Sequence, residues 1–204
     1  MPDRSPFVLG PRQKASEVRS FAVAHRRALG WLRGTVGFVA TLVRYVRLRV
    51  GTRGGSAPMV DDSVSMAVAM YRTLTPRLGA DEGLRVVRDQ VVASGAEMME
   101  DWLPEERSIV ALGDQVRVVM GDAETRGIYR IEALSTTETG ITLDVTSCRY
   151  AELTRQMGAP EVGQVFCAVD QPFVAGALPG LPFTCATTIA RGDDRCRFRA
   201  GDEA

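Results

Sequence analysis

The sequence predicts an α+β fold with N-terminal helices, a helical hairpin packed on an antiparallel sheet, two short helices and a C-terminal β-hairpin. Two patterns carry this prediction: apolar residues recur every three or four positions up to about residue 102, and later segments alternate between apolar and polar residues. With 204 residues, of which 45% are hydrophobic and 25% charged, the chain can form one cored domain and an appendage. These values exclude a disordered protein.

Basic residues concentrate near the N-terminus. Residues 1–60 hold 11 Arg and Lys against 2 Asp and Glu, whereas residues 61–204 hold 14 against 23. From Arg12 to Val50 the apolar spacing predicts a basic amphipathic helix, weakened in its middle by three glycines.

A linker composition at residues 51–59 separates this arm, residues 1–58, from an α+β body, residues 59–204. The charge asymmetry predicts that the arm meets an anionic surface: the acidic body, the second subunit of a homo-dimer, or phospholipid as a peripheral membrane contact. Nucleic-acid binding is not expected, because no known nucleic-acid-binding fold accompanies the charge. A transmembrane helix is not expected either, since the apolar run Gly34–Val43 has ten residues and a spanning helix needs about 20.

The four cysteines show no close pairing, so they do not form the dense pattern of a disulfide framework. The first ten residues are polar, and no apolar signal-peptide segment follows them. We therefore expect a cytoplasmic protein with reduced thiols.

Two helices are predicted to form a hairpin at the start of the body. The first covers about residues 61–78 with an aspartate as its N-cap, and the second covers about residues 81–102. Three strands are predicted to follow as an antiparallel meander. Gln115–Met120 is rich in valine, whereas Thr125–Leu134 and Gly140–Thr146 alternate between apolar and polar residues.

The last third of the chain returns to short elements. A helix is predicted over Arg149–Met157, and Pro160 begins a second one that reaches about Asp170. A loop rich in glycine and proline, residues 176–182, leads to a hairpin of strands Phe183–Ala190 and Arg195–Arg199.

Four motifs follow one another between Cys148 and Phe198. They are a strand-end Cys-Arg-Tyr-Ala-Glu, a Gly-x-Pro-Glu helix start, a Cys-x-x-Asp with an aromatic residue soon after, and a final Gly-x-x-x-Cys-x-Phe. On these motifs, and on a partial match at Thr187-Thr188, the C-terminal third resembles the L-2-amino-thiazoline-4-carboxylic acid hydrolases. In layout it is also similar to small-ligand-binding domains of the vinyl-reductase (V4R-like) type. The motifs occupy Cys148–Glu152, Gly158–Glu161, Cys167–Asp170 with Phe173, and Gly192–Phe198.

The first resemblance implies a cofactor-independent hydrolase whose small-molecule substrate is a cyclic amidine joined to a carboxylate. The implied reaction opens the ring at a C–N bond and yields a carbamoyl-cysteine. The second resemblance leaves open a binding or sensor module without turnover. Amidine hydrolysis needs a nucleophile for the ring carbon, a proton donor for the leaving atom and an anchor for the carboxylate.

Cys167 and Asp170 are the main catalytic candidates. Three residues apart on one predicted helix, they share a face and place a thiol beside a carboxylate. We expect Cys167 to act as the nucleophile and Asp170 as the amidinium partner or proton shuttle. The alternative is a buried, apolar cysteine, with Asp170 capping the following loop.

Cys148 lies at the predicted strand-to-helix junction and is the rival nucleophile, because main-chain N–H groups there can lower the pKa of its thiol. Close to it, Tyr150 can donate a hydrogen bond, Arg149 can bind a substrate carboxylate and Glu152 can serve as a base. For each of these three residues a packing or surface role is the alternative.

Thr188 and Cys196, on the predicted C-terminal hairpin, complete the expected substrate-binding residues, with core packing as the alternative for Cys196. No metal or cofactor is expected, since the cysteines lack the close spacing of structural zinc sites. The single histidine, His25, belongs to the arm, so a Cys-His dyad within the body is excluded.

Overall fold

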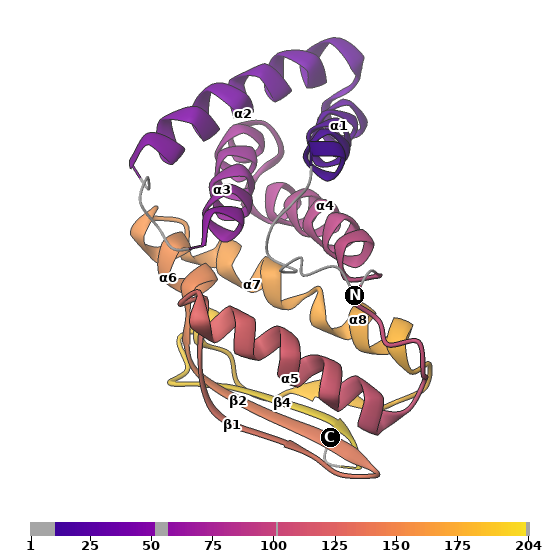
Figure 1. Ribbon diagram of the computed structural model, residues 1–204. Coiled ribbons are helices and arrows are strands. Elements are labelled where there is room, and N and C mark those ends of the chain that lie inside the picture. The colour runs from indigo at the N-terminus through magenta and orange to yellow at the C-terminus, as the bar shows by residue number, and fades with distance from the viewer. Residues whose placement is uncertain (1–10, 52–56, 101, 203–204) are drawn as a thin grey trace.

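The computed structural model of the protein describes residues 11–51, 57–100 and 102–202, and it confirms the α+β fold (Figure 1). The N-terminal helices occupy one end of the molecule, and an antiparallel sheet with a long helix across it occupies the other. A row of short helices lies between these two parts, so the sheet and the N-terminal helices enclose it from both sides.

The arm consists of two helices, so the prediction of a single helix from Arg12 to Val50 is wrong. Helix α1 (Pro11–Leu29) ends at Gly30, whose φ of 77° lies in the left-handed region, and α2 (Trp31–Gly51) begins directly after it. The two helices cross closely, since a Cβ on Gly34 would lie 2.5 Å from the Cα of Arg26. Glycine thus lets the chain fold back on itself here.

His25 lies buried between α1 and α2. Its Nδ1 is 2.8 Å from the Phe21 carbonyl oxygen and its Nε2 is 2.8 Å from the Thr41 hydroxyl. Burial lowers the pKa of His25, so the imidazole is neutral at pH 7 and holds the two helices together. None of the described helices is both long enough and apolar enough to cross a membrane.

The predicted helical hairpin is formed by α3 (Pro58–Leu78) and α4 (Ala80–Glu100), which meet at Gly79. Buried charges at the start of α3 tie it to its neighbours. Asp61 is 1% exposed and accepts hydrogen bonds at 2.8 Å from both Nε and Nη2 of Arg149, while Arg49 of α2 lies 3.8 Å from its other oxygen. Arg49 also pairs with Asp62. Part of the basic arm therefore faces the acidic start of the body.

A long helix, α5 (Ile109–Thr125), replaces the predicted strand Gln115–Met120, and that prediction is wrong. Ser108 caps the helix by accepting a hydrogen bond from the N–H of Ala111 at 3.1 Å. Its buried residues Leu112, Val119 and Ala123 follow a helical period, which the run of valines in this segment obscures.

The sheet contains β1 (Tyr129–Thr136), β2 (Gly140–Cys148), β3 (Phe183–Cys185) and β4 (Cys196–Gly201) in the antiparallel order β1-β2-β4-β3. As the alternation predicted, Ile141, Leu143 and Val145 are buried. They lie opposite Ala200, Phe198 and Cys196 of β4, on the face that α5 covers.

Short helices connect the strands: α6 (Arg149–Gln156), the 3₁₀ turn η1 (Pro160–Val162), α7 (Gly163–Cys167), α8 (Asp170–Ala177) and the 3₁₀ turn η2 (Ile189–Arg191). The predicted helix over 160–170 is thus divided into separate elements. Gly176 belongs to α8 and not to a loop, and the predicted strand Phe183–Ala190 ends at Cys185, followed by η2.

Candidate functional site

A cavity of about 460 Å³ lies between α1 of the arm, the helices α3, α4 and α5, the sheet and the short helices α7 and α8. This volume is within the range of small-molecule binding sites. Apolar side chains from all of these elements form its wall, among them Met98, Trp102, Val119, Leu143, Phe166 and Phe198.

Polar side chains also line this cavity, and five of them lie close enough to influence one another's ionisation. They are Tyr129 from β1, Cys148 at the end of β2, Tyr150 from α6, Cys167 at the end of α7 and Asp170 at the start of α8. The rings of Tyr129 and Tyr150 lie 6.2 Å apart. Burial raises the pKa of Tyr129 well above its ordinary value, and negative charge on any of the other four groups raises it further. These five residues form one electrostatic unit.

Asp170 is the carboxylate of this unit. Although its side chain keeps some surface facing the cavity, the surrounding protein removes enough water to raise the pKa of Asp170 to about 7. Within the described residues, no arginine forms an ion pair with it. A carboxyl group with a pKa near 7 can both accept and donate a proton at neutral pH.

The two cavity thiols of this unit differ in their surroundings. Burial raises the pKa of both. Cys148 is the N-cap of α6, where the N–H groups of Ala151 and Tyr150 oppose that rise, and its pKa is about 11. Cys167 ends α7, and the negative charge of Asp170 adds to the rise that burial causes. Neither thiol is ionised at neutral pH on its own, but a thiolate forms more easily at Cys148.

Cys167 and Asp170 do not share one helix as the sequence predicted. The N–H groups of Ala168 and Val169 bond three residues back, at 3.3 and 3.4 Å, so the chain tightens after α7 and α8 begins anew. Val169 packs here against α4, where a Cβ on Gly95 would lie 2.6 Å from its Cγ1. Both Cys167 and Asp170 nevertheless line the cavity.

Arg149 lies outside the cavity wall, and its guanidinium binds the buried Asp61. Tyr150 follows Arg149 in α6 and points about 100° away from it around the helix axis, so Tyr150 can line the cavity while Arg149 binds Asp61. Arg149 also donates its main-chain N–H to the Ile128 carbonyl at 2.9 Å. It therefore fixes the end of β2 beside Cys148.

Glu152 and Thr188 are not part of the cavity wall either. Glu152 is exposed and accepts a hydrogen bond from Gln156 at 3.0 Å, and Thr188 is buried, with a hydroxyl that has no partner among the described residues. Cys196 does line the cavity, and it is also buried, with its sulfur accepting the N–H of Ile189 at 3.3 Å. Cys196 thus belongs both to the core and to the cavity wall, and its part in substrate binding stays a prediction.

Tyr129 is the site residue that the sequence reasoning missed. In the register of β1 and β2 it lies directly opposite Cys148. Pairing the two predicted strands residue by residue from their turn would have brought the two together. The aromatic wall could not be found in this way, because it depends on how α5, α7 and α8 pack.

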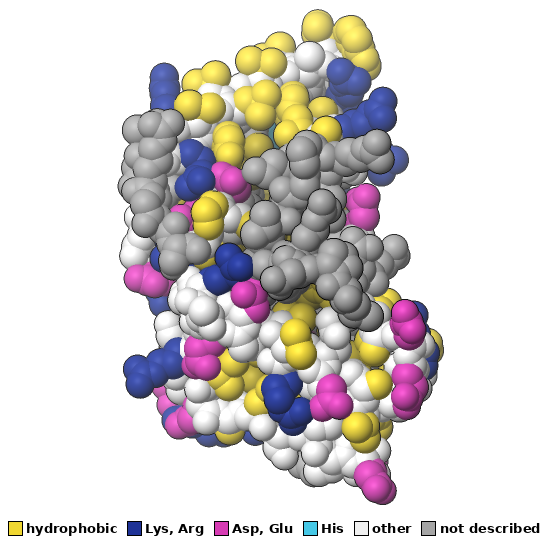
Figure 2. All heavy atoms as spheres, in the orientation of Figure 1, with side chains coloured by type: hydrophobic (Ala, Val, Ile, Leu, Met, Phe, Trp, Pro, Cys, Tyr) yellow, Lys and Arg dark blue, Asp and Glu magenta, His cyan; other side chains and the backbone are white. Residues whose placement is uncertain are grey.

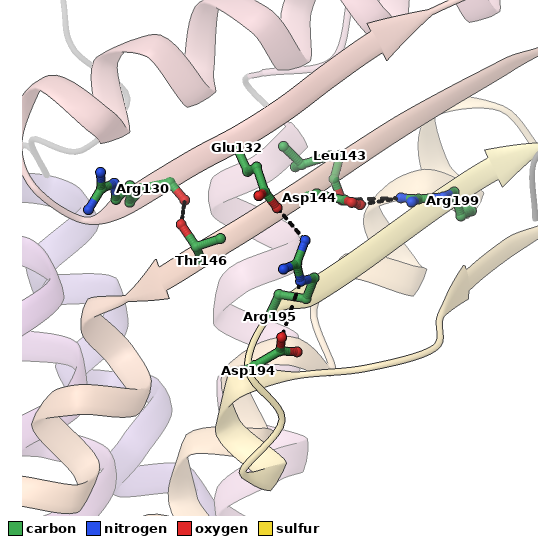
Figure 3. Close-up of polar contacts among 8 residues, drawn as sticks. All are labelled: Arg130, Glu132, Leu143, Asp144, Thr146, Asp194, Arg195 and Arg199. Carbon is green, nitrogen blue, oxygen red and sulfur yellow. Dashed lines mark hydrogen bonds and ion pairs between the residues drawn. The ribbon is translucent and has the colours of Figure 1, made fainter.

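Arg199 is the only basic residue among the described ones that border the cavity, but its guanidinium lies on the other face of the sheet. It follows Phe198 on β4, so its side chain alternates outward, and it pairs with Asp144 at 2.6 Å (Figure 3). Arg195 forms a second pair with Glu132 on this outer face. Among the described residues no cation compensates the charge of Asp170, so the cavity favours a cationic or neutral guest over a second anion.

All four cysteines have free thiols. In residues 11–51, 57–100 and 102–202 no three His, Cys, Asp or Glu side chains are grouped so that they could hold a metal ion. The reactive groups that the described part of the cavity presents are its thiols, two phenols, carboxyl groups and serine hydroxyls.

No curated protein and no solved structure matches the chain. Residues 62–200, from the start of α3 to β4, match the family described as L-2-amino-thiazoline-4-carboxylic acid hydrolase. This range contains both tyrosines, both thiols and the carboxylate that converge on the cavity, and it leaves out the arm. The protein therefore belongs to the L-2-amino-thiazoline-4-carboxylic acid hydrolase family, as the motifs that begin at Cys148 predicted.

Proposed function

We propose that the protein is a hydrolase that opens a cyclic amidine at its C–N bond, with a cavity thiol as the nucleophile and Asp170 as the amidinium partner and proton carrier. One observation carries this proposal: Asp170, which has no ion-pair partner among the described residues, lines the same cavity as the thiols of Cys148 and Cys167. Family membership supports hydrolysis as the reaction class.

Asp170 fits the charge of the reacting group. A protonated amidine presents parallel N–H donors, which bind a carboxylate through two charge-assisted hydrogen bonds. The positive charge of the bound amidinium would favour the ionised form of Asp170 and of the thiols beside it. The substrate would thus supply the cation that the described residues of the cavity lack.

We favour Cys148 over Cys167 as the attacking thiol. Main-chain N–H groups at the start of α6 already stabilise a thiolate at Cys148, whereas the negative charge of Asp170 opposes a thiolate at Cys167. Cys167 then contributes to the shape and polarity of the pocket. This proposal exchanges the roles that the sequence prediction gave to the two thiols, and the separate substitutions below distinguish the two assignments.

The reaction proceeds in two balanced steps. Asp170 takes the thiol proton, the thiolate forms a C–S bond to the amidine carbon, and the adduct collapses with cleavage of the ring C–N bond as the proton passes to the leaving nitrogen. Water then adds to the same carbon, the C–S bond to the enzyme breaks and the thiol is restored. The net change is the uptake of one water molecule.

Tyr129 and Tyr150 can steady the adduct. Burial raises the pKa of both phenols, so both keep their protons at neutral pH. A neutral phenol can donate a hydrogen bond to the atom on which negative charge develops. The remaining wall is largely apolar, and Arg149 and Arg199 are bound to Asp61 and Asp144. We therefore propose an apolar substituent on the amidine in place of the carboxylate in the family's name.

The test offers the purified protein three substrates: 2-amino-thiazoline-4-carboxylate, 2-amino-thiazoline without the carboxylate, and the same ring with an apolar substituent. Mass spectrometry should show the gain of one water, with the highest kcat/KM for the apolar compound. C–N cleavage of the thiazoline releases no free thiol, so a new thiol in the product would show that the ring opens at sulfur instead.

Single substitutions identify the thiol. Cys148→Ser should lower kcat by about 10³ or more, and Cys167→Ser by about tenfold. Cys185→Ser is the matched control, because this half-buried cysteine lies outside the cavity wall, and its turnover should not change. Full turnover by both Cys148→Ser and Cys167→Ser would remove the thiol mechanism.

A ligand-binding module without turnover is the second candidate, and one observation favours it. Burial keeps both cavity thiols protonated at neutral pH, as in a pocket that only binds. Micromolar binding of an amidine that yields no product between pH 6 and pH 9 would support this alternative over hydrolysis.

A further inference from the structure

An apolar stripe runs along the outer face of α2. Its five residues are spaced alternately by four and three positions, which places them on one side of the helix. Each is between 48% and 70% exposed, and Trp31, at the N-terminal end of α2, is 71% exposed. Single exposed apolar residues are ordinary, but a continuous line of them marks a binding surface. The stripe consists of Leu32, Val36, Val39, Val43 and Val46.

The fold does not need this stripe, because α2 is held by its opposite face. Gly34 and Gly37 lie against α1, and Thr41 is buried with its hydroxyl bound to His25. In Figure 2 apolar side chains gather along the top of the molecule, where Figure 1 places α1 and α2. The stripe is thus free to meet something outside the molecule.

The surroundings of the stripe are basic. Helix α2 contains no Asp or Glu, and Arg33 and Arg47 are exposed beside the stripe. Arg33 also borders a shallow hollow together with Arg77, the exposed arginine at the end of α3, and with Leu32 and Val36 of the stripe. Apolar side chains and cations therefore share one surface.

The charges on α2 argue against a second copy of the chain as the partner that covers the stripe. If two α2 helices met antiparallel around Val39, Arg33 of one would lie near Arg47 of the other. If they met parallel, each arginine would face its own counterpart. Because α2 has no acidic residue to separate these charges, both arrangements place like charges together.

We infer that α2 docks on the surface of an anionic phospholipid bilayer. The stripe enters the boundary between headgroups and acyl chains, and the arginines contact lipid phosphates. Trp31, with the guanidinium of Arg26 5.9 Å from its ring centroid, has the amphipathic character of residues that lie at membrane interfaces. The helix lies in the plane of the interface and does not span it.

The position of α2 allows this contact. Figure 1 shows α2 at the outer edge of the molecule, at the end opposite to the sheet. A flat surface can therefore reach the whole stripe without meeting the sheet or α5. This inference concerns the arm, outside the matched residues 62–200, and does not depend on the reaction proposed above.

The experiment is co-sedimentation of the full-length protein with vesicles of phosphatidylcholine alone and of phosphatidylcholine with one quarter phosphatidylglycerol. We expect binding to the anionic vesicles that is at least tenfold tighter and that weakens in high salt. Tryptophan emission should shift to shorter wavelength on binding, and Trp31→Phe should abolish the shift, because the other tryptophan, Trp102, is buried in the body.

The double variant Val39→Asp/Val43→Asp should lower vesicle binding at least tenfold. Its matched control is Val110→Asp/Val118→Asp, which changes two exposed valines of α5 and should bind like the unmodified protein. Arg33→Gln/Arg77→Gln, which leaves the stripe intact, should lose most of the preference for anionic vesicles.

Three results would overturn the inference. They are no binding of the unmodified protein to either vesicle, equal binding by Val39→Asp/Val43→Asp, or a dimer in ultracentrifugation that this variant dissociates. The last would assign the stripe to a second copy of the chain. Circular dichroism of each variant shows whether it is folded.

Discussion

Asp61 and Asp170 are two carboxylates withdrawn from water in the same body, and they differ in their partners. Asp61 accepts two hydrogen bonds from Arg149 and lies near Arg49, so its charge is neutralised by the protein. Asp170 has no arginine paired with it among the described residues, and its pKa rises to about 7. The charge at Asp61 holds elements together, whereas in the function proposed above the charge at Asp170 binds the substrate.

This difference predicts opposite effects of substitution at the two sites. Removing a partner from Asp61 leaves a buried charge uncompensated, which is strongly destabilising. Removing the charge of Asp170 removes the free-energy cost of burying that charge, so it should raise stability and lower activity.

The largest expected effect is on stability, at Arg149. Arg149→Ala should lower the free energy of unfolding by about 3–5 kcal/mol, because Asp61 keeps its charge and loses its closest partner. Urea denaturation measures the change. In the double variant Asp61→Leu/Arg149→Met both charges are replaced by apolar groups, and most of the stability should return. If the single variant is as stable as the unmodified protein, the pair does not have the role that we assign to it.

The next effect is at Asp170, with the opposite sign. The pKa of Asp170 is higher in the folded protein than in the unfolded chain. Between about pH 4 and pH 7 the folded protein therefore still holds a proton that the unfolded chain has lost. As a result, stability falls as the pH rises through this window. Asp170→Asn should therefore raise the free energy of unfolding by about 2–4 kcal/mol at pH 8 and leave it unchanged at pH 4.

The same substitution tests function. Asp170→Asn should lower kcat by about 10² or more, and the unmodified enzyme should gain activity as the pH rises through about 7. Urea titrations at the two pH values, combined with turnover assays, check both predictions. A variant that is equally stable at pH 8 but inactive would mean that Asp170 is not buried in the way described.

A smaller effect is expected at Gly95, which contacts Val169 between Cys167 and Asp170. A methyl group there would lie 2.6 Å from Val169 Cγ1, so Gly95→Ala should push the turn before α8 and shift Asp170. We expect a loss of about 1–3 kcal/mol in stability and a lower kcat. Gly121→Ala, at an exposed position of α5 with open space around the added methyl, is the matched control; it should leave kcat unchanged and raise stability by up to about 1 kcal/mol.

The smallest effect is expected at the charge pair on the outer face of the sheet. Arg199→Met removes the partner of Asp144, which can turn to solvent, and should cost less than about 1 kcal/mol. Turnover should not change, because the guanidinium faces away from the cavity. A large loss of substrate affinity in this variant would show that Arg199 reaches the substrate after all.

The fold could be predicted where one period dominates the sequence. The alternation of Ile141, Leu143 and Val145 indicated a strand, and the break at Gly79 separated two helices. The prediction failed at α5. Over six residues, the valine-rich segment of this helix fits the helical period as well as the composition of a strand, so the sequence alone does not distinguish the two.

The site could be predicted in part for a similar reason. The motif spacing indicated three candidate residues, and all three border the cavity: Cys148, Cys167 and Asp170. It could not tell that Arg149 turns to Asp61, because that depends on the direction in which α6 leaves β2. It also could not find Tyr129, whose neighbours come from strand register and not from sequence distance.

The bridge at Asp61 has a practical consequence for anyone who shortens this protein. The match to the family begins at residue 62, which invites a cut there. Such a cut would discard Asp61 and Arg49 together and leave the guanidinium of Arg149 without its carboxylate, one residue away from the thiol of Cys148. The shared sequence of a family therefore does not mark the smallest piece that folds, and a truncated form needs to keep residue 61 and the helices that cover it.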